Sequence, residues 1–93
     1  MAPVHPGEIL REELMERALT ASALARALDV PVTRVTDLLN AKRGISADTA
    51  LRLARFFGGG PQLWLNLQQS YDLKVAEGKA GDLIRRRVRP AAA

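Results

Sequence analysis

Residues 20–40 constrain the fold more than any other part of the chain, because they hold two short amphipathic patterns separated by a tight break. The apolar residues are Leu24, Ala25 and Leu28 in the first pattern and Val35, Leu38 and Leu39 in the second. Each set follows the spacing of one helix face, and Thr20 is a favourable N-cap for the first helix. Two helices joined by a turn of about three residues form a helix-turn-helix. We therefore predict this motif here, with the small Ala25 where the helices touch.

Helix-start signals recur along the rest of the chain. Proline suits the first turn of a helix, and serine suits the N-cap. Such residues stand at Pro6, Pro31, Ser46 and Pro61. Glycines at 58–60 are expected to end the fourth helix, and Asn40 and Gly44 to supply left-handed backbone in the turn at 40–44. The prediction is an all-α fold, a compact five-helix bundle without strands.

The chain divides into three parts. Residues 1–5 are expected to be a flexible N-terminus, and residues 6–76 to form one helical domain. After Asp72 the apolar pattern weakens, so residues 77–93 are expected to be a basic, frayed tail. Two interpretations of its arginines stay open: they contact DNA phosphates, or they belong to a disordered end. These arginines are Arg85, Arg86, Arg87 and Arg89.

Length and composition exclude several functions. A chain of 93 residues has room for one domain and one core. It has no cysteine and a single histidine, His5, so we expect no disulfide and no metal site. The serines and carboxylates form no recognisable catalytic pair, and no phosphate-binding glycine loop occurs. We therefore expect no catalytic residue, cofactor or small-molecule substrate. No apolar run of about 18 residues and no secretory signal are visible, so we expect no membrane contact and a cytoplasmic location.

The polar side of the third helix is suited to reading DNA. Positive charge gathers in residues 30–60 and 77–93, which favours an anionic partner such as nucleic acid. The candidates for reading base edges in the major groove are Thr33, Arg34, Thr36, Asp37 and Asn40. The candidates for phosphate contacts are Thr20, Ser22, Lys42 and Arg43. Asp37 disfavours DNA binding, because phosphates repel its carboxylate. The exceptions are a carboxylate that accepts a hydrogen bond from a cytosine amino group or that pairs with a nearby arginine.

Several motifs, taken together, resemble those of the HigA antitoxins, also called VapI. They are His5-Pro6-Gly7-Glu8-Ile9-Leu10, Leu24-Ala25-Arg26-Ala27-Leu28, Ala47-Asp48-Thr49-Ala50-Leu51-Arg52-Leu53-Ala54-Arg55, Trp64-Leu65-Asn66-Leu67-Gln68 and Tyr71-Asp72-Leu73, with Val35, Asn40, Arg43 and Ile45 between them. The resemblance spans residues 5–73. It implies a lambda-repressor-like (XRE-type) helix-turn-helix protein that acts as a homodimer. The implied partners are double-stranded operator DNA and a HigB-type toxin, which cleaves mRNA on the ribosome. The resemblance also implies that the protein represses the operon that encodes both itself and this toxin.

Two further surfaces follow from this resemblance. The region from Trp64 to Leu73 is implied to help form the dimer; Leu63, Leu67 and Tyr71 are candidates that could also pack in the core, and Trp64 is expected to cap the core. The acidic residues Glu8, Glu12 and Glu16 lie on one side of the first helix. They are candidates for binding the toxin, and the alternative is a solvated helix face.

Two other functions stay open at this point. One is a free-standing repressor of the same fold that has no toxin partner. The other is a protein-binding module that has lost DNA binding.

Overall fold

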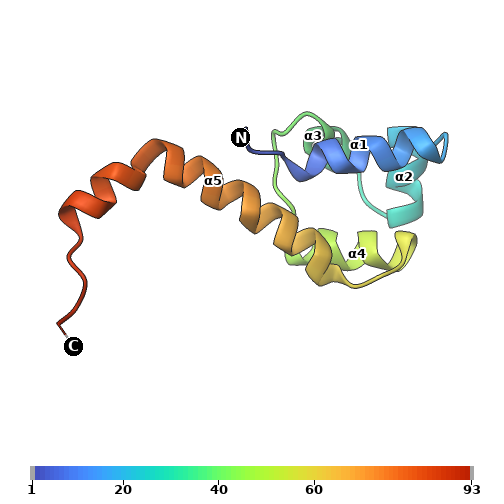
Figure 1. Cartoon of the computed structure of the whole chain (residues 1–93). Coiled ribbons are helices and arrows are strands. Elements are labelled where there is room, and N and C mark those ends of the chain that lie inside the picture. Colours follow the sequence, from blue (N-terminus) through green and yellow to red (C-terminus); the bar gives the residue numbers. More distant parts are fainter. Residues whose placement is uncertain (1, 93) are drawn as a thin grey trace.

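The computed structural model describes residues 2–92, which form five α-helices and no strand. The helices are α1 (Pro6–Glu16), α2 (Ala21–Leu28), α3 (Val32–Leu39), α4 (Ala47–Phe57) and α5 (Pro61–Arg87). Figure 1 shows α1–α4 packed with the first half of α5, while the second half of α5 projects away from this body. The molecule is therefore elongated, with extents of 52 × 24 × 22 Å. The predicted all-α fold of five helices is confirmed.

Side-chain caps set where α2 and α4 begin. The Thr20 hydroxyl accepts a hydrogen bond from the backbone N–H of Ala23, and the Ser46 hydroxyl accepts one from Thr49. Each cap satisfies one of the N–H groups that the first turn of a helix leaves without a partner. Both predicted caps are confirmed. Pro31 precedes α3 as its N-cap instead of being its first residue.

The N-terminal segment differs from the expectation of flexibility at His5, whose side chain is buried. The His5 Nδ1 accepts from the N–H of Gly7 at 2.9 Å, and the His5 N–H donates to Glu8 Oε2 at 3.2 Å. The His5 ring also packs edge-on against Tyr71 of α5, with ring centroids 4.8 Å apart. His5 is therefore the N-cap of α1, in a reciprocal capping box. Residue 1 lies outside the described residues.

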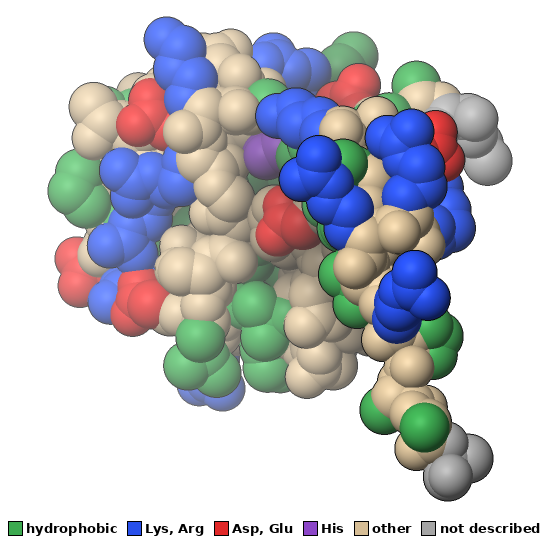
Figure 2. Space-filling view, turned by 90° about the vertical axis from the view of Figure 1, so that its left-hand side faces the viewer, with side chains coloured by type: hydrophobic (Ala, Val, Ile, Leu, Met, Phe, Trp, Pro, Cys, Tyr) green, Lys and Arg blue, Asp and Glu red, His purple; other side chains and the backbone are tan. Residues whose placement is uncertain are grey.

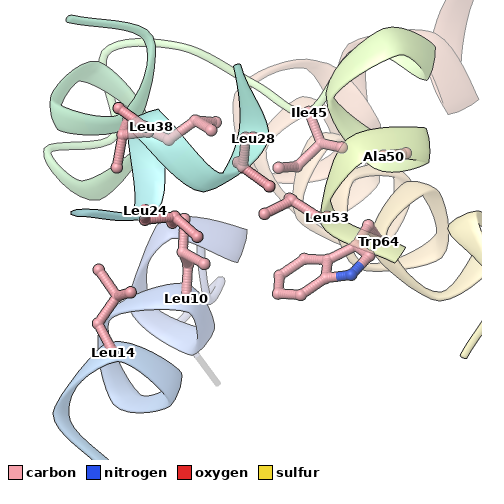
Figure 3. Close-up of a cluster of buried hydrophobic side chains, with 11 residues drawn as sticks. Leu10, Leu14, Leu24, Leu28, Leu38, Ile45, Ala50, Leu53 and Trp64 are labelled. Carbon is pink, nitrogen blue, oxygen red and sulfur yellow. The ribbon is translucent and has the colours of Figure 1, made fainter. Parts of the chain in front are cut away.

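One apolar core joins all five helices (Figure 3). Its fully buried leucines are Leu10, Leu24, Leu38 and Leu53. Burial of each such side chain contributes about 1.5–3 kcal/mol to folding. Trp64 of α5 covers the core at 4% exposure, as predicted. At Gly7, α1 approaches α3 so closely that a Cβ atom would overlap the carbonyl oxygen of Leu38.

The expected frayed tail is wrong for residues 77–87, because α5 continues without interruption to Arg87. Arg85 forms ion pairs with Glu77 and, at 2.6 Å, with Asp82. Arginines in the last turn also interact favourably with the negative end of the helix dipole. These charges stabilise a helix segment that an apolar pattern alone does not predict.

The turn after α3 also differs from expectation. The left-handed residue is Ala41, with φ of 57°, whereas Asn40 has φ of −95°. The Lys42 N–H donates to the carbonyl of Asp37 at 2.8 Å, which is the hydrogen bond of a Schellman motif. That motif requires left-handed backbone at the residue after the C-cap, and Ala41 occupies this position.

Candidate nucleic-acid interface

The turn between α2 and α3 fixes the angle at which α3 projects. Asp29 adopts left-handed backbone with φ of 57°, and the N–H of Val30 donates to the carbonyl of Ala25 at 3.0 Å. These contacts end α2 abruptly, and Pro31 then leads directly into α3. Val35 and Leu38 are buried against α2, so the opposite side of α3 faces outward.

Four of the five predicted base-reading residues lie on this outward side of α3 or at its edge. Thr33 and Asn40 are exposed, and Thr36 and Asp37 are half-buried. The Asp37 carboxylate lies 3.7 Å from the Arg43 guanidinium. A nearby arginine was one of the two arrangements expected to make Asp37 compatible with DNA, and this one reduces the negative charge that Asp37 presents to a phosphate.

Arg34, the fifth predicted base-reading residue, lies on the flank of α3 that faces α4. Its Nη1 donates to Asp48 Oδ2 at 2.5 Å, and Arg52 Nε donates to the same oxygen at 2.9 Å. The hydrogen bond from Arg52, followed by that from Arg34, lowers the pKa of Asp48 below its ordinary value of 3.8. Arg34 is thus held against α4 by an ion pair, whereas the ion pair of Asp37 is with Arg43 in the loop that follows α3.

Arg52 extends this cluster to α2. Its Nη1 donates to the carbonyls of Leu28 at 2.8 Å and Asp29 at 3.1 Å. These carbonyls belong to the helix end and turn that otherwise lack partners. Asp48 and Arg52 therefore connect α2, α3 and α4, a role that the sequence analysis missed because the contacts join residues 14 to 24 positions apart.

The predicted phosphate contacts lie in two segments of the chain. Thr20 and Ser22 stand at the start of α2, and Lys42 and Arg43 stand in the loop that follows α3; all four are exposed. This loop is fixed from α5, since Gln68 Oε1 accepts from the N–H of Ile45 at 2.8 Å. Gln68 was not among the predicted site residues. A helix start and exposed cations are each suited to contact with phosphate.

The acidic residues of α1 differ in whether they have partners within the chain. Glu8 contributes to the capping box, and Glu13 pairs with Arg17 at 3.3 Å. Glu12 and Glu16 are exposed, and neither forms an ion pair among residues 2–92. Only these two carboxylates are thus available to an external partner without loss of an internal contact.

The three candidates for dimerisation have different surroundings. Leu63 is 59% exposed, Leu67 packs partly against the core, and Tyr71 is half-buried beside His5. Leu67 and Tyr71 therefore have partners within their own chain, and Leu63 has most of its surface free. No helix within residues 2–92 combines the length and the apolar character needed to cross a membrane.

Comparison with known proteins gives concordant matches. A helix-turn-helix family model matches residues 10–64. Virulence-associated protein I of Dichelobacter nodosus is 56% identical over 78 residues, which cover 83% of this chain and 72% of that protein.

Two solved structures are similar over almost the whole chain. An addiction module antidote protein of the HigA family from Coxiella burnetii has a TM-score of 0.95 at 53% identity, covering 98% of this chain and 100% of the other. Pseudomonas aeruginosa antitoxin HigA, solved with the higBA promoter, has a TM-score of 0.93 at 47% identity, covering 97% and 99%. The structural similarity thus includes the second half of α5.

Proposed function

We propose, from the premise that this chain belongs to the HigA/VapI branch of the XRE-type helix-turn-helix family, that it is the antitoxin of a toxin–antitoxin module. The members of this family are DNA-binding regulators and not enzymes. In this proposal a dimer binds operator DNA and represses its own operon. The same protein binds and neutralises a HigB-type mRNA-cleaving toxin.

The observation that carries DNA binding is the outward side of α3. Thr33 and Asn40 are exposed there, and Lys42 and Arg43 follow directly in an exposed loop. The major groove is about 12 Å wide and admits one helix, whose side chains reach the base edges while flanking cations contact phosphates. The similarity to the HigA protein solved with the higBA promoter supports the same use of α3 here.

A dimer follows from the small size of the reading surface. A single recognition helix contacts only a few base pairs, whereas a two-fold pair reads two half-sites about one helical turn apart. Such a pair would also explain why α5 projects from the body of an otherwise small domain.

The decisive experiment measures binding of the full chain to its own promoter and to scrambled DNA over a salt series. Asn40→Ala is expected to reduce the preference for the promoter by about 1–3 kcal/mol. Lys42→Ala is expected to weaken binding to both DNAs and to lower the salt slope by about 1. Lys74→Ala, an exposed lysine on α5, is the matched control and should leave the binding unchanged. Equal affinity of the wild type for both DNAs would refute operator recognition.

Toxin binding is assigned to the exposed carboxylates Glu12 and Glu16 of α1. HigB-type toxins resemble small basic proteins, so this acidic surface is complementary in charge. The double variant Glu12→Lys, Glu16→Lys should weaken binding to the toxin encoded beside the gene and leave the melting temperature unchanged. Reversal of Glu13 is avoided because its ion pair with Arg17 is internal.

The two activities have separable outcomes. Unchanged toxin affinity in the double variant would move the toxin site to another surface. If the wild type binds its promoter but no small basic protein is encoded beside the gene, the protein is a free-standing repressor.

A further inference from the structure

The loop between α3 and α4 carries two exposed cations and is bonded to a helix that is remote in sequence. Lys42 and Arg43 stand in this loop, and Ile45, near its end, is buried in the core. The N–H of Ile45 donates to Gln68 Oε1 of α5 at 2.8 Å, and the two residues are 23 positions apart in the chain. The loop is thus held from α5 as well as from the two helices that it joins.

The side-chain amide of Gln68 lies directly against the backbone of this loop. A Cβ atom at Gly44 would lie 3.0 Å from both Cδ and Oε1 of Gln68, which is tighter than an ordinary van der Waals contact. Gly44 stands between Arg43 and Ile45, so the amide touches the loop beside a cation and bonds it at the next N–H. A shift of the amide would therefore move the backbone that carries the cations.

Asp72 determines which end of the Gln68 amide faces the loop. Gln68 Nε2 donates to Asp72 Oδ1 at 2.9 Å, one turn further along α5. A primary amide has a donor nitrogen and an acceptor oxygen, whereas a carboxylate at neutral pH only accepts. The carboxylate therefore binds the amide nitrogen and leaves the amide oxygen for the N–H of Ile45. The two contacts of Gln68 support the same orientation of its side chain.

Other cations of the chain are independent of Gln68. Figure 2, which looks onto α5 from its C-terminal end, shows Lys and Arg side chains gathered around that end. Arg86 and Arg87 belong to the last turn of α5, whereas Gln68 follows Leu67, which packs against the core. The chain thus offers two sets of cations for comparison, of which only the loop set is bonded to Gln68.

We propose that Gln68 is a positioning residue for DNA binding. Oriented by Asp72, its amide oxygen holds the loop so that Lys42 and Arg43 lie where they contact phosphates beside α3. The inference rests on the DNA binding of the proposed function, and it assigns a role to a residue that acts through the loop. Phosphate contacts fix the register of a protein on the duplex, so Gln68 contributes both to affinity and to the placement of α3.

The first measurement tests the contact in the absence of DNA. Gln68→Met keeps the length of the side chain and removes both of its hydrogen-bonding groups. Amide hydrogen exchange followed by NMR should show that the N–H of Ile45 loses protection in this variant. Gln62→Met is the matched control, because Gln62 donates to Asn66 at 2.9 Å with the same spacing on the same helix. It should leave Ile45 unchanged, and unchanged protection in Gln68→Met would overturn the proposal.

The second measurement is a double-mutant cycle on binding of the full chain to its promoter over a salt series. Lys42→Ala should lower the salt slope by about 1 in the wild-type background, and by less in the Gln68→Met background, because the loop no longer holds this cation at its phosphate. Independent residues multiply their effects on affinity to within about twofold, so a larger departure is expected here. Arg87→Ala should combine with Gln68→Met multiplicatively. A loss of stability alone would leave Lys42 multiplicative as well, and that result would overturn the proposal.

An exchange of the two side-chain groups tests the part played by Asp72. Gln68→Glu alone places a carboxylate against that of Asp72, so Ile45 should lose protection and DNA binding should weaken. Adding Asp72→Asn supplies a donor at position 72 and returns the net charge of the pair to that of the wild type. The protection of Ile45 and the coupling to Lys42 should then return. A double variant that recovers neither would overturn the role of Asp72.

These outcomes are separable from those of the proposed function, because phosphate contacts are independent of sequence and the cycle can also be run on scrambled DNA. Coupling between Gln68 and Lys42 on both DNAs, with equal affinity of the wild type for the two, would retain the role of Gln68 and overturn operator recognition. A preference for the promoter without this coupling would retain operator recognition and overturn the role of Gln68.

Discussion

Arg34 in α3 and Asp48 in the first turn of α4 are joined by an ion pair in which Nη1 lies 2.5 Å from Oδ2. Asp48 also accepts from Arg52, and Arg52 donates to the carbonyl of Leu28 at the end of α2. The Asp48 carboxylate thus connects α3 to α4 directly and to α2 through Arg52. The orientation of α3 is therefore set by these side chains as well as by the turn between α2 and α3.

Asp48 makes the stability of the domain depend on acid. Because Arg52 and Arg34 lower the pKa of folded Asp48 below 3.8, the stabilising contribution is complete above 3.8 and is lost as the pH falls through the lowered value. Asp48→Asn should therefore be less stable than the wild type at neutral pH. The difference in urea midpoint between the two proteins should shrink below pH 3.8. A difference that grows in acid would contradict the prediction.

The ion pair also predicts how Arg34 affects DNA binding. Since Arg34 is held against α4, Arg34→Ala should weaken binding to promoter and scrambled DNA by similar factors. The ratio of the two affinities should stay nearly constant, whereas Asn40→Ala should lower it. Competition binding with both DNAs measures the ratio. A fall in the ratio for Arg34→Ala as large as that for Asn40→Ala would show that Arg34 reads a base.

The contact of α1 with α3 depends on the absence of a side chain at residue 7. Gly7→Ala would bring a Cβ atom into the carbonyl of Leu38, and the backbone shift that relieves it should cost about 1–3 kcal/mol. Gly78→Ala is the matched control, because a Cβ atom at Gly78, in the second half of α5, would meet nothing within 4 Å. It should be neutral or stabilise by up to about 1 kcal/mol. Chemical denaturation of both variants measures the two changes, and equal effects would disprove the close contact.

A strained residue follows α1. Ala18 adopts left-handed backbone with φ of 53°, which disfavours residues that carry a Cβ. Ala18→Gly removes this strain and should stabilise the domain by about 0.5–1 kcal/mol after the added freedom of the unfolded chain is counted. The melting temperature should rise by a few degrees (about 4–8 °C per kcal/mol at this size). Ala27→Gly, at an exposed helical position, should lower it instead.

Helix starts could be predicted from the sequence because they depend on neighbouring residues. Thr20 and Ser46 cap their helices through contacts three residues away, and the buried faces follow helical spacing. The left-handed position at Ala41 is different, since it follows from where α3 ends and not from the preference of alanine. The burial of His5 depends on Tyr71, which lies far along the chain and reaches it only after folding.

The candidate site was predictable in part for the same reason. The outward side of α3 follows from the apolar residues on its other side, so Thr33 and Asn40 could be identified from spacing alone. Neither the pairing of Arg34 with Asp48 nor the contact of Gln68 with Ile45 has a local signal. The length of α5 was missed because an exposed helix with two glycines lacks the pattern that burial imposes.

The side-chain amide of Gln68 has a consequence for the loop that carries Lys42 and Arg43. Its oxygen accepts from Ile45, and its nitrogen donates to Asp72 at 2.9 Å, so the loop is attached to the longest helix of the molecule. Fixing the backbone of a free loop costs about 1–2 kcal/mol of conformational entropy for each residue. Folding has already fixed this loop through Gln68, so an anion that bound to Lys42 and Arg43 would not need to order it.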